Sequence, residues 1–250
     1  MSNGVARRAL LFHAAVAFCL VAGAQFGTAT YAADLAQNVA AMKIAMIGAG
    51  REGGALGTLF SKHGHQVMFA SRHPEQLKDL VASAGSAAKA GTVEQAIAFA
   101  DVVFLVVPYT AIEQIGNEYG KTIATKPLVI DVSNPIARRD GEELVKQVNE
   151  QGGAGLMTQK YLPGSRLVRA FNAIGAGTLE DLSKKKGEIG VPIAGDDQKA
   201  VELASALIRE VGFEPVLIGG LGMGKYLVPG TPLAGAHSPA EIKRAVATLK

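Results

Sequence analysis

Cysteine is nearly absent from this chain of 250 residues, and this absence narrows the functions to consider. The single cysteine is Cys19, which lies in an apolar stretch close to the amino terminus. If that stretch is removed, the remaining chain can form no disulfide, no thiolate metal site and no cysteine nucleophile. The mature fold would then be indifferent to an oxidising compartment.

A strong charge imbalance is also missing, since 25 lysines and arginines stand against 22 acidic residues. No basic segment carries interleaved aromatic residues, so we predict no nucleic-acid partner. The histidines show no metal-ligand spacing, and we predict no metal site. Ser133 has no evident histidine or carboxylate partner, which argues against a serine hydrolase.

The first 32 residues have the three parts of a secretory signal peptide. Arg7 and Arg8 precede an apolar run from residue 9 to 21, and Thr30 and Ala32 are the small residues before the expected cut. The run is shorter than the roughly 20 apolar residues of a spanning helix, which favours cleavage over an uncleaved membrane anchor. We therefore predict a signal peptide at 1–32, a linker at 33–41 and an exported protein, periplasmic or secreted. The arginine pair also agrees with the twin-arginine route, which carries folded proteins and would allow a cofactor to travel inside.

Short apolar runs alternate with helical stretches in the rest of the chain, and the runs lack two-residue alternation. This pattern is typical of parallel strands buried on both faces. We predict an α/β fold, a Rossmann-type, doubly wound and mostly parallel sheet over residues 42–228, followed by a tail and helix over 229–250. The predicted strands are Lys43–Ile47, Gln66–Ser71, Val102–Val107, Leu128–Val132, Arg166–Phe171, Pro192–Ala194 and Glu214–Ile218. The predicted helices are Gly54–His63, Pro74–Ala84, Val93–Ala98, Arg139–Glu150, Thr178–Lys185, Asp197–Val211 and Pro239–Leu249, the last capped by Ser238.

The stretch MKIAMIGAGREGG, residues 42–54, predicts a buried strand that runs into a glycine-rich turn and a helix. Gly48, Gly50 and Gly53 give the spacing G-x-G-x-x-G. The first glycine permits the tight turn, the second lets the backbone approach a pyrophosphate, and the third lets helix and strand pack closely. The free N–H groups of the helix start would bind the anion. In this context the loop predicts dinucleotide binding.

The end of the second predicted strand favours NADP over NAD. An NAD site has an acidic residue there, about 20 residues after the loop, to bind the ribose hydroxyls. This chain has Ser71 and Arg72 instead. The guanidinium of Arg72 can pair with a 2′-phosphate, and the Ser71 hydroxyl can donate a hydrogen bond. The alternative is a solvated loop arginine.

Residues that follow the third, fourth and fifth predicted strands would meet at the carboxyl edge of the sheet, where open α/β sheets bind ligands. Pro108 and Tyr109 would lie near the nicotinamide half of a bound cofactor. Tyr109 could stack there or pack under the following helix, and the sequence leaves both open. Asn134, Asn172 and Ala173 are expected at the same rim.

Six segments occur in the order and spacing of one family: IGAGREGGALG, SRHPEQL, FLVVP, RAFNAIGAG, VPIAGDD and PVLIGGL. Over residues 42–228 the chain resembles the NADPH-dependent reductases of the deazaflavin coenzyme F-420, which are related to the oxidoreductase domain of the metalloreductases. The resemblance implies that NADP is bound by the loop from Gly48 to Gly53 including Ala49, Arg51 and Glu52, by Ser71 and Arg72, and by the Val107–Pro108 corner. It also implies that Asn172 to Ile174 lie between cofactor and acceptor.

The implied activity is hydride transfer between NADP(H) and a flavin-like ring or another small acceptor, which depends on stacking and distance more than on an acid or base. No catalytic side chain is therefore predicted. The tail after Leu227 is shorter and more polar than the apolar terminal helix of the resembled family, which leaves the acceptor and a homodimer open. A non-catalytic NADP-binding or sensor protein and a reductase of a small carbonyl or imine compound are the alternatives.

Overall fold

An eight-stranded sheet with the strand order β3-β2-β1-β4-β5-β6-β7-β8 organises the described chain. The computed structural model describes residues 41–249. The predicted signal peptide, and the predicted linker apart from residue 41, lie outside the described residues. No helix within residues 41–249 has the length and apolarity that crossing a membrane requires.

The sheet is mostly parallel, as the sequence predicted. Every neighbouring pair of strands is parallel except β6 and β7, which run antiparallel. The chain crosses from β3 at one edge to β4 beside β1, which creates a switch point between β1 and β4. The strands are β1 (Lys43–Ile47), β2 (Gln66–Ala70), β3 (Ala88–Gly91), β4 (Val102–Leu105), β5 (Leu128–Asp131), β6 (Leu167–Arg169), β7 (Gly190–Gly195) and β8 (Glu214–Gly219).

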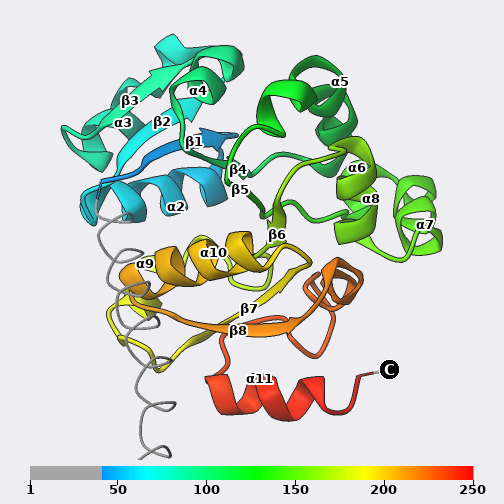
Figure 1. The fold of residues 1–250 in the computed structure, drawn as a ribbon. Coiled ribbons are helices and arrows are strands. Elements are labelled where there is room, and N and C mark those ends of the chain that lie inside the picture. Colours follow the sequence, from blue (N-terminus) through cyan, green and yellow to red (C-terminus); the bar gives the residue numbers. More distant parts are fainter. Residues whose placement is uncertain (1–40, 250) are drawn as a thin grey trace, which may run out of the picture. The chain divides into compact units, whose positions relative to one another are not determined.

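Helices cover both faces of the sheet (Figure 1). Helices α2 (Arg51–Lys62) and α10 (Gln198–Glu210) pack on one face, and α4 (Val93–Phe99) and α5 (Ile112–Ile123) on the other. The two core layers formed in this way confirm the doubly wound fold. The remaining helices are η1 (Pro74–Leu77), α3 (Lys78–Ala84), η2 (Tyr109–Ala111), α6 (Ala137–Asp140), α7 (Glu142–Glu150), α8 (Ala154–Tyr161), α9 (Leu179–Ser183), η3 (Leu221–Tyr226) and α11 (Pro239–Val246).

One strand and two α-helices were not predicted. Strand β3 has the sequence AKAG and only Gly91 in it is buried, so no apolar run marked it. Helix α5 follows the Pro108 corner, and α8 begins after two glycines, where the sequence resembles a loop. One predicted helix is in fact two, because Gly141 at φ +92° breaks it between α6 and α7.

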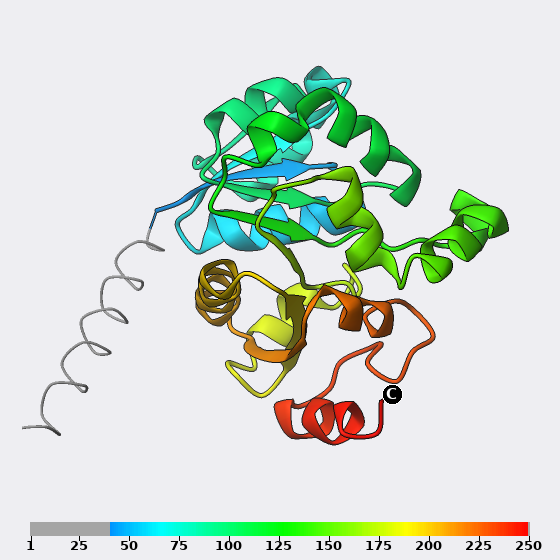
Figure 2. The ribbon, with the colours of Figure 1, turned by 45° about the vertical axis from the view of Figure 1, so that its right-hand side comes forward.

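The tail after residue 228 is part of the same packing (Figure 2). Helix α11 contacts β7 and β8, and Ile242 is buried with Leu227 and Leu233. Ser238 caps the helix as predicted, and Glu241 completes a capping box with it. No element was predicted between Ile218 and Pro239, and the structure has η3 there, directly after β8.

Candidate functional site

A cleft of about 430 Å³ opens where β1, β4, β5 and β6 end, beside the switch point of the sheet. Open α/β sheets bind ligands at this place. Eight of the predicted site residues line the cleft: Gly50, Arg51, Glu52, Val107, Pro108, Asn134, Asn172 and Ala173. The structure therefore brings together residues that are separated by more than a hundred positions in the sequence.

The glycine loop has the geometry that its predicted role requires. Gly48 adopts φ +103°, which favours glycine, and a side chain there would strike the carbonyl group of Val106. A Cβ at Gly53 would overlap the carbonyl oxygen of Gly48, so the helix can approach the turn only without one. A Cβ at Gly50 would meet no atom within 4 Å. Packing therefore explains two glycines, while the open space at Gly50 suits the close approach of a ligand.

Ser71 and Arg72 follow β2, the strand next to β1, as the sequence placed them. The Ser71 hydroxyl accepts a hydrogen bond from the backbone N–H of His73 at 3.0 Å, which shapes the turn. Arg72 is exposed and makes no ion pair with the other described residues. Ser71 and Arg72 do not line the 430 Å³ cleft. They follow β2, which lies on the side of β1 away from β4 and β5.

Glu52 joins the start of α2 to the loop after β6. Its Oε2 accepts a hydrogen bond from the backbone N–H of Ala176 at 2.8 Å, whereas its Oε1 has no partner among the described residues. Burial raises the pKa of Glu52 to about 7, against the lowering effects of the Ala176 N–H and of Arg51. The cleft therefore contains a carboxyl group that titrates near neutral pH.

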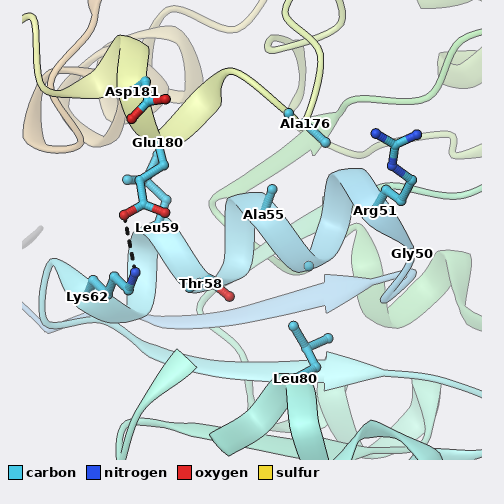
Figure 3. A pocket seen from close by; sticks show the side chains of 12 residues that line it. Gly50, Arg51, Ala55, Thr58, Leu59, Lys62, Leu80, Ala176, Glu180 and Asp181 are labelled. Carbon is cyan, nitrogen blue, oxygen red and sulfur yellow. Dashed lines mark hydrogen bonds and ion pairs between the residues drawn. The ribbon is translucent and has the colours of Figure 1, made fainter. Parts of the chain in front are cut away.

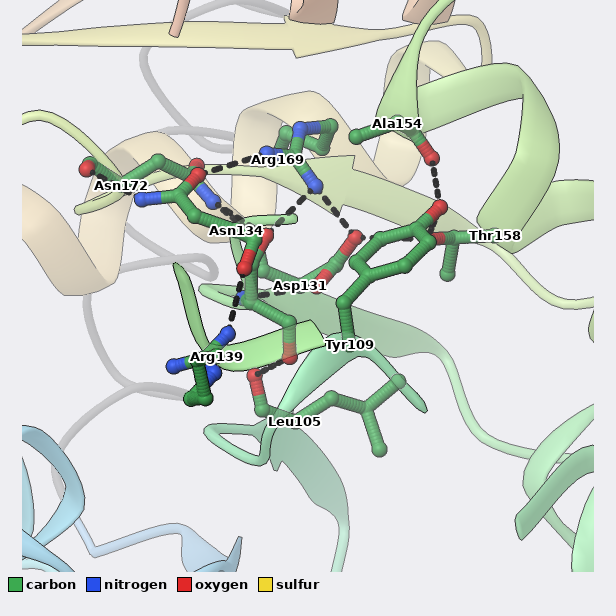
Figure 4. Close-up of polar contacts among 10 residues, drawn as sticks. Leu105, Tyr109, Asp131, Asn134, Arg139, Ala154, Thr158, Arg169 and Asn172 are labelled. Atoms are coloured by element: carbon green, nitrogen blue, oxygen red, sulfur yellow. Dashed lines mark hydrogen bonds and ion pairs between the residues drawn. The ribbon is translucent and has the colours of Figure 1, made fainter. Parts of the chain in front are cut away.

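A buried ion pair, which sequence reasoning missed, lies beneath the cleft (Figure 4). Asp131 at the end of β5 and Arg169 at the end of β6 have side chains with no exposed surface. The Thr158 hydroxyl donates to Asp131 Oδ2 at 2.9 Å, and Arg169 also donates to the Ser133 carbonyl at 3.0 Å. The signal available was the charged residue that ends each of two otherwise apolar strands.

Tyr109 packs in this network and does not face the cleft. Its side chain is buried, and its hydroxyl donates to the Ala154 carbonyl at 2.9 Å and lies 3.1 Å from the Thr158 hydroxyl (Figure 4). Burial, followed by the charge of Asp131, raises the pKa of Tyr109 far above its usual range. Of the two predicted roles, packing is the one observed: Tyr109 is buried with Ile112 of the following helix α5, and also with Ala154 and Met157 of α8.

The two predicted asparagines are held by the same network. Asn134 Oδ1 accepts from Arg169 Nη2 at 3.1 Å, and its Nδ2 donates to the Asn172 carbonyl at 2.8 Å. Asn172 Nδ2 donates to the carbonyls of Asp131 and Ser133, at 3.0 and 3.3 Å. These acceptors fix the orientation of the Asn172 amide, whose Oδ1 is left without a partner among the described residues.

A strained turn brings Asn172 and Ala173 to the cleft. Phe171, which precedes them, adopts φ +62°, a conformation that non-glycine residues seldom take. Its ring is buried between Phe60 and Phe213, with centroid distances of 6.3 and 6.0 Å. This packing stabilises the turn and so sets the position of the cleft wall.

Several lining residues were not predicted as site residues, among them an arginine and a proline. Arg139 comes from α6, and Pro229 comes from the tail. The tail is also tied to the cleft wall, because the Gly235 N–H donates to the Ala173 carbonyl at 2.8 Å. The segment that departs from the resembled family thus forms part of the cleft.

A second hollow of about 460 Å³ lies on the outer side of α2, between that helix, Leu80 and α9 (Figure 3). Three of its charged residues form ion pairs: Lys62 contacts Glu180 at 3.4 Å, and Asp181 contacts Lys184 at 2.9 Å, while Arg51 lines both this hollow and the first cleft. It is bordered by helix flanks and not by strand ends, so we assign the ligand site to the first cleft. Residues 41–249 contain no cluster of histidine, cysteine and acidic side chains able to hold a metal ion.

Comparison with known proteins confirms the resemblance and the fold. Residues 43–135 match the model of the family described as NADP oxidoreductase, coenzyme F-420-dependent. That segment runs from β1 through β5 and contains the glycine loop, Ser71, Arg72 and the Val107–Pro108 corner. The matched family consists of NADP-dependent oxidoreductases, the enzyme class that the sequence predicted. No curated protein matches the chain.

Solved structures share the fold. A hypothetical protein of Sinorhizobium meliloti is 27% identical, with a TM-score of 0.62 over 77% of this chain and 93% of its own. A protein of an Arthrobacter species, whose assignment as an F-420-dependent NADP reductase is itself provisional, is 21% identical, with a TM-score of 0.63 over 74% of this chain and 87% of its own. A pyrroline-5-carboxylate reductase of Coxiella burnetii is 19% identical, with a TM-score of 0.51 over 70% of this chain and 58% of its own.

Proposed function

We propose, from the family match of residues 43–135 and the cleft beside the glycine loop, that this protein is an NADPH-dependent oxidoreductase with a flavin-like or other small acceptor. The observation that carries the proposal is the loop geometry: Gly48 and Gly53 are required by packing, whereas Gly50 faces open space at the start of α2. Such a site offers unpaired backbone N–H groups to a pyrophosphate. When bound, NADPH supplies the hydride for the reaction.

The described residues fit that cofactor. Ser71 and Arg72, next to the glycine loop, would hold the 2′-phosphate, with the guanidinium as the charged partner. Val107 and Pro108 at the end of β4 and Ala173 in the wall after β6 offer apolar surface on the far side of the loop. Asn134 and Asn172 are held rigidly by Asp131 and Arg169, so this part of the cleft is preorganised.

A steady-state assay of NADPH oxidation against flavins, deazaflavins and ferric chelates tests the proposal. Turnover with a flavin or deazaflavin is the expected result. Turnover with small carbonyl or imine compounds alone would show that the acceptor is not flavin-like and would favour the alternative reductase. Tight NADPH binding without turnover on any acceptor would instead identify a non-catalytic NADP-binding or sensor protein. That result would reject the proposed enzymatic activity.

Export is a further part of the proposal, and it rests on the signal-peptide pattern of residues 1–32. An exported enzyme that needs NADPH must receive the cofactor before it crosses the membrane or meet it outside. The protein isolated from the exported fraction should therefore begin near residue 33 and contain NADP(H). A full-length chain confined to the cytoplasmic fraction would contradict this part of the proposal.

A further inference from the structure

Arg139 lies at the end of the cleft away from the predicted 2′-phosphate residues. Ser71 and Arg72 follow β2, the glycine loop follows β1, and Arg139 comes after β5, which is separated from β1 by β4. A dinucleotide whose phosphates lie at the glycine loop extends across the carboxyl ends of these strands. With its adenosine half at β2, its nicotinamide half lies toward β4 and β5. Arg139 is therefore on the acceptor side.

The guanidinium of Arg139 is held in one orientation. Its Nε and Nη2 donate to the two carboxylate oxygens of Asp140, at 2.9 and 2.8 Å. Nη2 also donates to the Asn134 carbonyl at 2.6 Å, the contact drawn in Figure 4. The Asp140 side chain is only 1% exposed and also accepts from the Ile136 N–H at 2.9 Å. Burial alone would raise the pKa of Asp140, but the hydrogen bonds from Arg139 and Ile136 have the larger combined effect. The pKa of Asp140 is therefore below its usual value. The ionised Asp140 thus fixes Arg139.

One edge of this guanidinium remains available. The Nη1 group of Arg139 makes no hydrogen bond with other described residues, and the side chain is 40% exposed at the cleft. A guanidinium that is already oriented loses little rotamer freedom when it binds a phosphate or carboxylate. Arg139 is therefore prepared for an anion before one arrives.

The charged groups of the cleft also favour an anion. Its ionisable lining residues are Arg51, Arg139 and Glu52, and Asp140 lies behind Arg139 outside the lining. The Glu52 carboxyl group is turned to the Ala176 N–H. We infer that the acceptor carries a phosphate or carboxylate group and that Arg139 binds it. This inference rests on the proposed function and names the substrate class for the same cleft.

FMN and riboflavin provide the test, because they share the same ring and differ by one phosphate group. Binding of each to the full mature chain loaded with NADP⁺ is measured by quenching of flavin fluorescence, and turnover is measured by NADPH oxidation. We expect FMN to bind more tightly than riboflavin. In Arg139→Gln the ratio of the FMN to the riboflavin Kd should shift about tenfold toward riboflavin, the loss expected for one charge-assisted hydrogen bond. Arg139→Lys should restore part of the preference.

Arg138→Gln is the matched control. Arg138 is the neighbouring exposed arginine of α6 and does not line the cleft, so its loss should leave the ratio of the two Kd values unchanged. Inorganic phosphate and acetate, compared as competitors at equal ionic strength, separate a phosphate preference from a carboxylate preference. Equal affinity for FMN and riboflavin, absence of FMN binding, or equal effects of the two glutamine variants would overturn the inference. Selective FMN binding without any NADPH oxidation would support the anion site and reject the proposed enzyme.

Discussion

Asp131 and Arg169 form an ion pair that solvent does not reach. They are direct neighbours in the register of β5 and β6, and neither side chain has exposed surface. Arg169 also donates to the Asn134 side chain and the Ser133 carbonyl, two groups at the cleft. The pair therefore couples the stability of the sheet to the shape of the cleft.

Removing one partner of this pair should be costly, because the other is left as an unpaired buried charge. We expect Arg169→Met to lower the free energy of unfolding by about 3–5 kcal/mol, measured by urea denaturation. Arg166→Met is the control: that arginine is 46% exposed and lies 3.8 Å from Asp197, so its loss should cost about 1 kcal/mol or less. Similar losses in the two variants would contradict the role given to the buried pair.

Two glycines of the same loop should respond differently to alanine. A Cβ at Gly53 overlaps the Gly48 carbonyl oxygen, so Gly53→Ala should destabilise the fold and weaken NADPH binding together. Gly50 has φ −74° and open space around it, so Gly50→Ala should change the free energy of unfolding by only about 0.5 kcal/mol. Gly50→Ala should nevertheless weaken NADPH binding, because the added methyl group fills the space that the pyrophosphate needs close to the backbone. Thermal unfolding and NADPH titration of both variants check this, and unchanged NADPH affinity in Gly50→Ala would count against the proposed pyrophosphate site.

NADPH affinity should depend on the ionisation of Glu52. Because burial raises the pKa of this group to about 7, the carboxyl is mostly neutral at pH 6 and mostly ionised at pH 8. Ionisation places a negative charge at the start of α2, where the pyrophosphate is expected, so affinity should fall as the pH rises through 7. Glu52→Gln should bind NADPH more tightly than the native protein at pH 8 and almost equally at pH 6.

The comparison between native protein and variant removes the titration of the NADPH phosphate itself, which is common to both. Glu142→Gln, at an exposed position at the start of α7, serves as the control and should keep the native pH dependence. An identical pH profile for native protein and Glu52→Gln would show that Glu52 does not titrate beside the cofactor.

The glycine loop at the cleft and the Ser71–Arg72 turn beside it could be predicted because their signals are local in the sequence. The glycine spacing, the strand before it and the Ser71–Arg72 pair all lie within about thirty positions, and the fold places them as expected. The ends of the buried strands were predicted to within a few residues, since continuous apolar runs mark them. The edge strand β3 was missed because most of its residues are not buried, so it has no continuous apolar run.

The part of the cleft at the ends of β5 and β6 could not be predicted in the same way. Asp131 and Arg169 are separated by 38 positions, and only the pairing of β5 with β6 makes them partners. Arg139 was included in a predicted helix of ordinary amphipathic composition, and Gly141 breaks that helix so that α6 lies at the cleft. Tertiary contacts that no sequence pattern shows therefore decide the positions of these residues.

The most direct test of the account is the cofactor preference of Arg72→Ala, because the NADP site is the claim on which the proposed function depends. The Kd values of NADPH and NADH are measured by fluorescence titration for the native protein, for Arg72→Ala and for the control Lys78→Ala, at an exposed position of α3. We expect Arg72→Ala to weaken NADPH about tenfold or more, as for a lost charge-assisted contact, with little change for NADH. The control should change neither value. If Arg72→Ala weakened the binding of NADPH and NADH equally, or changed neither Kd, Arg72 would not bind the 2′-phosphate. Either result would contradict the central claim.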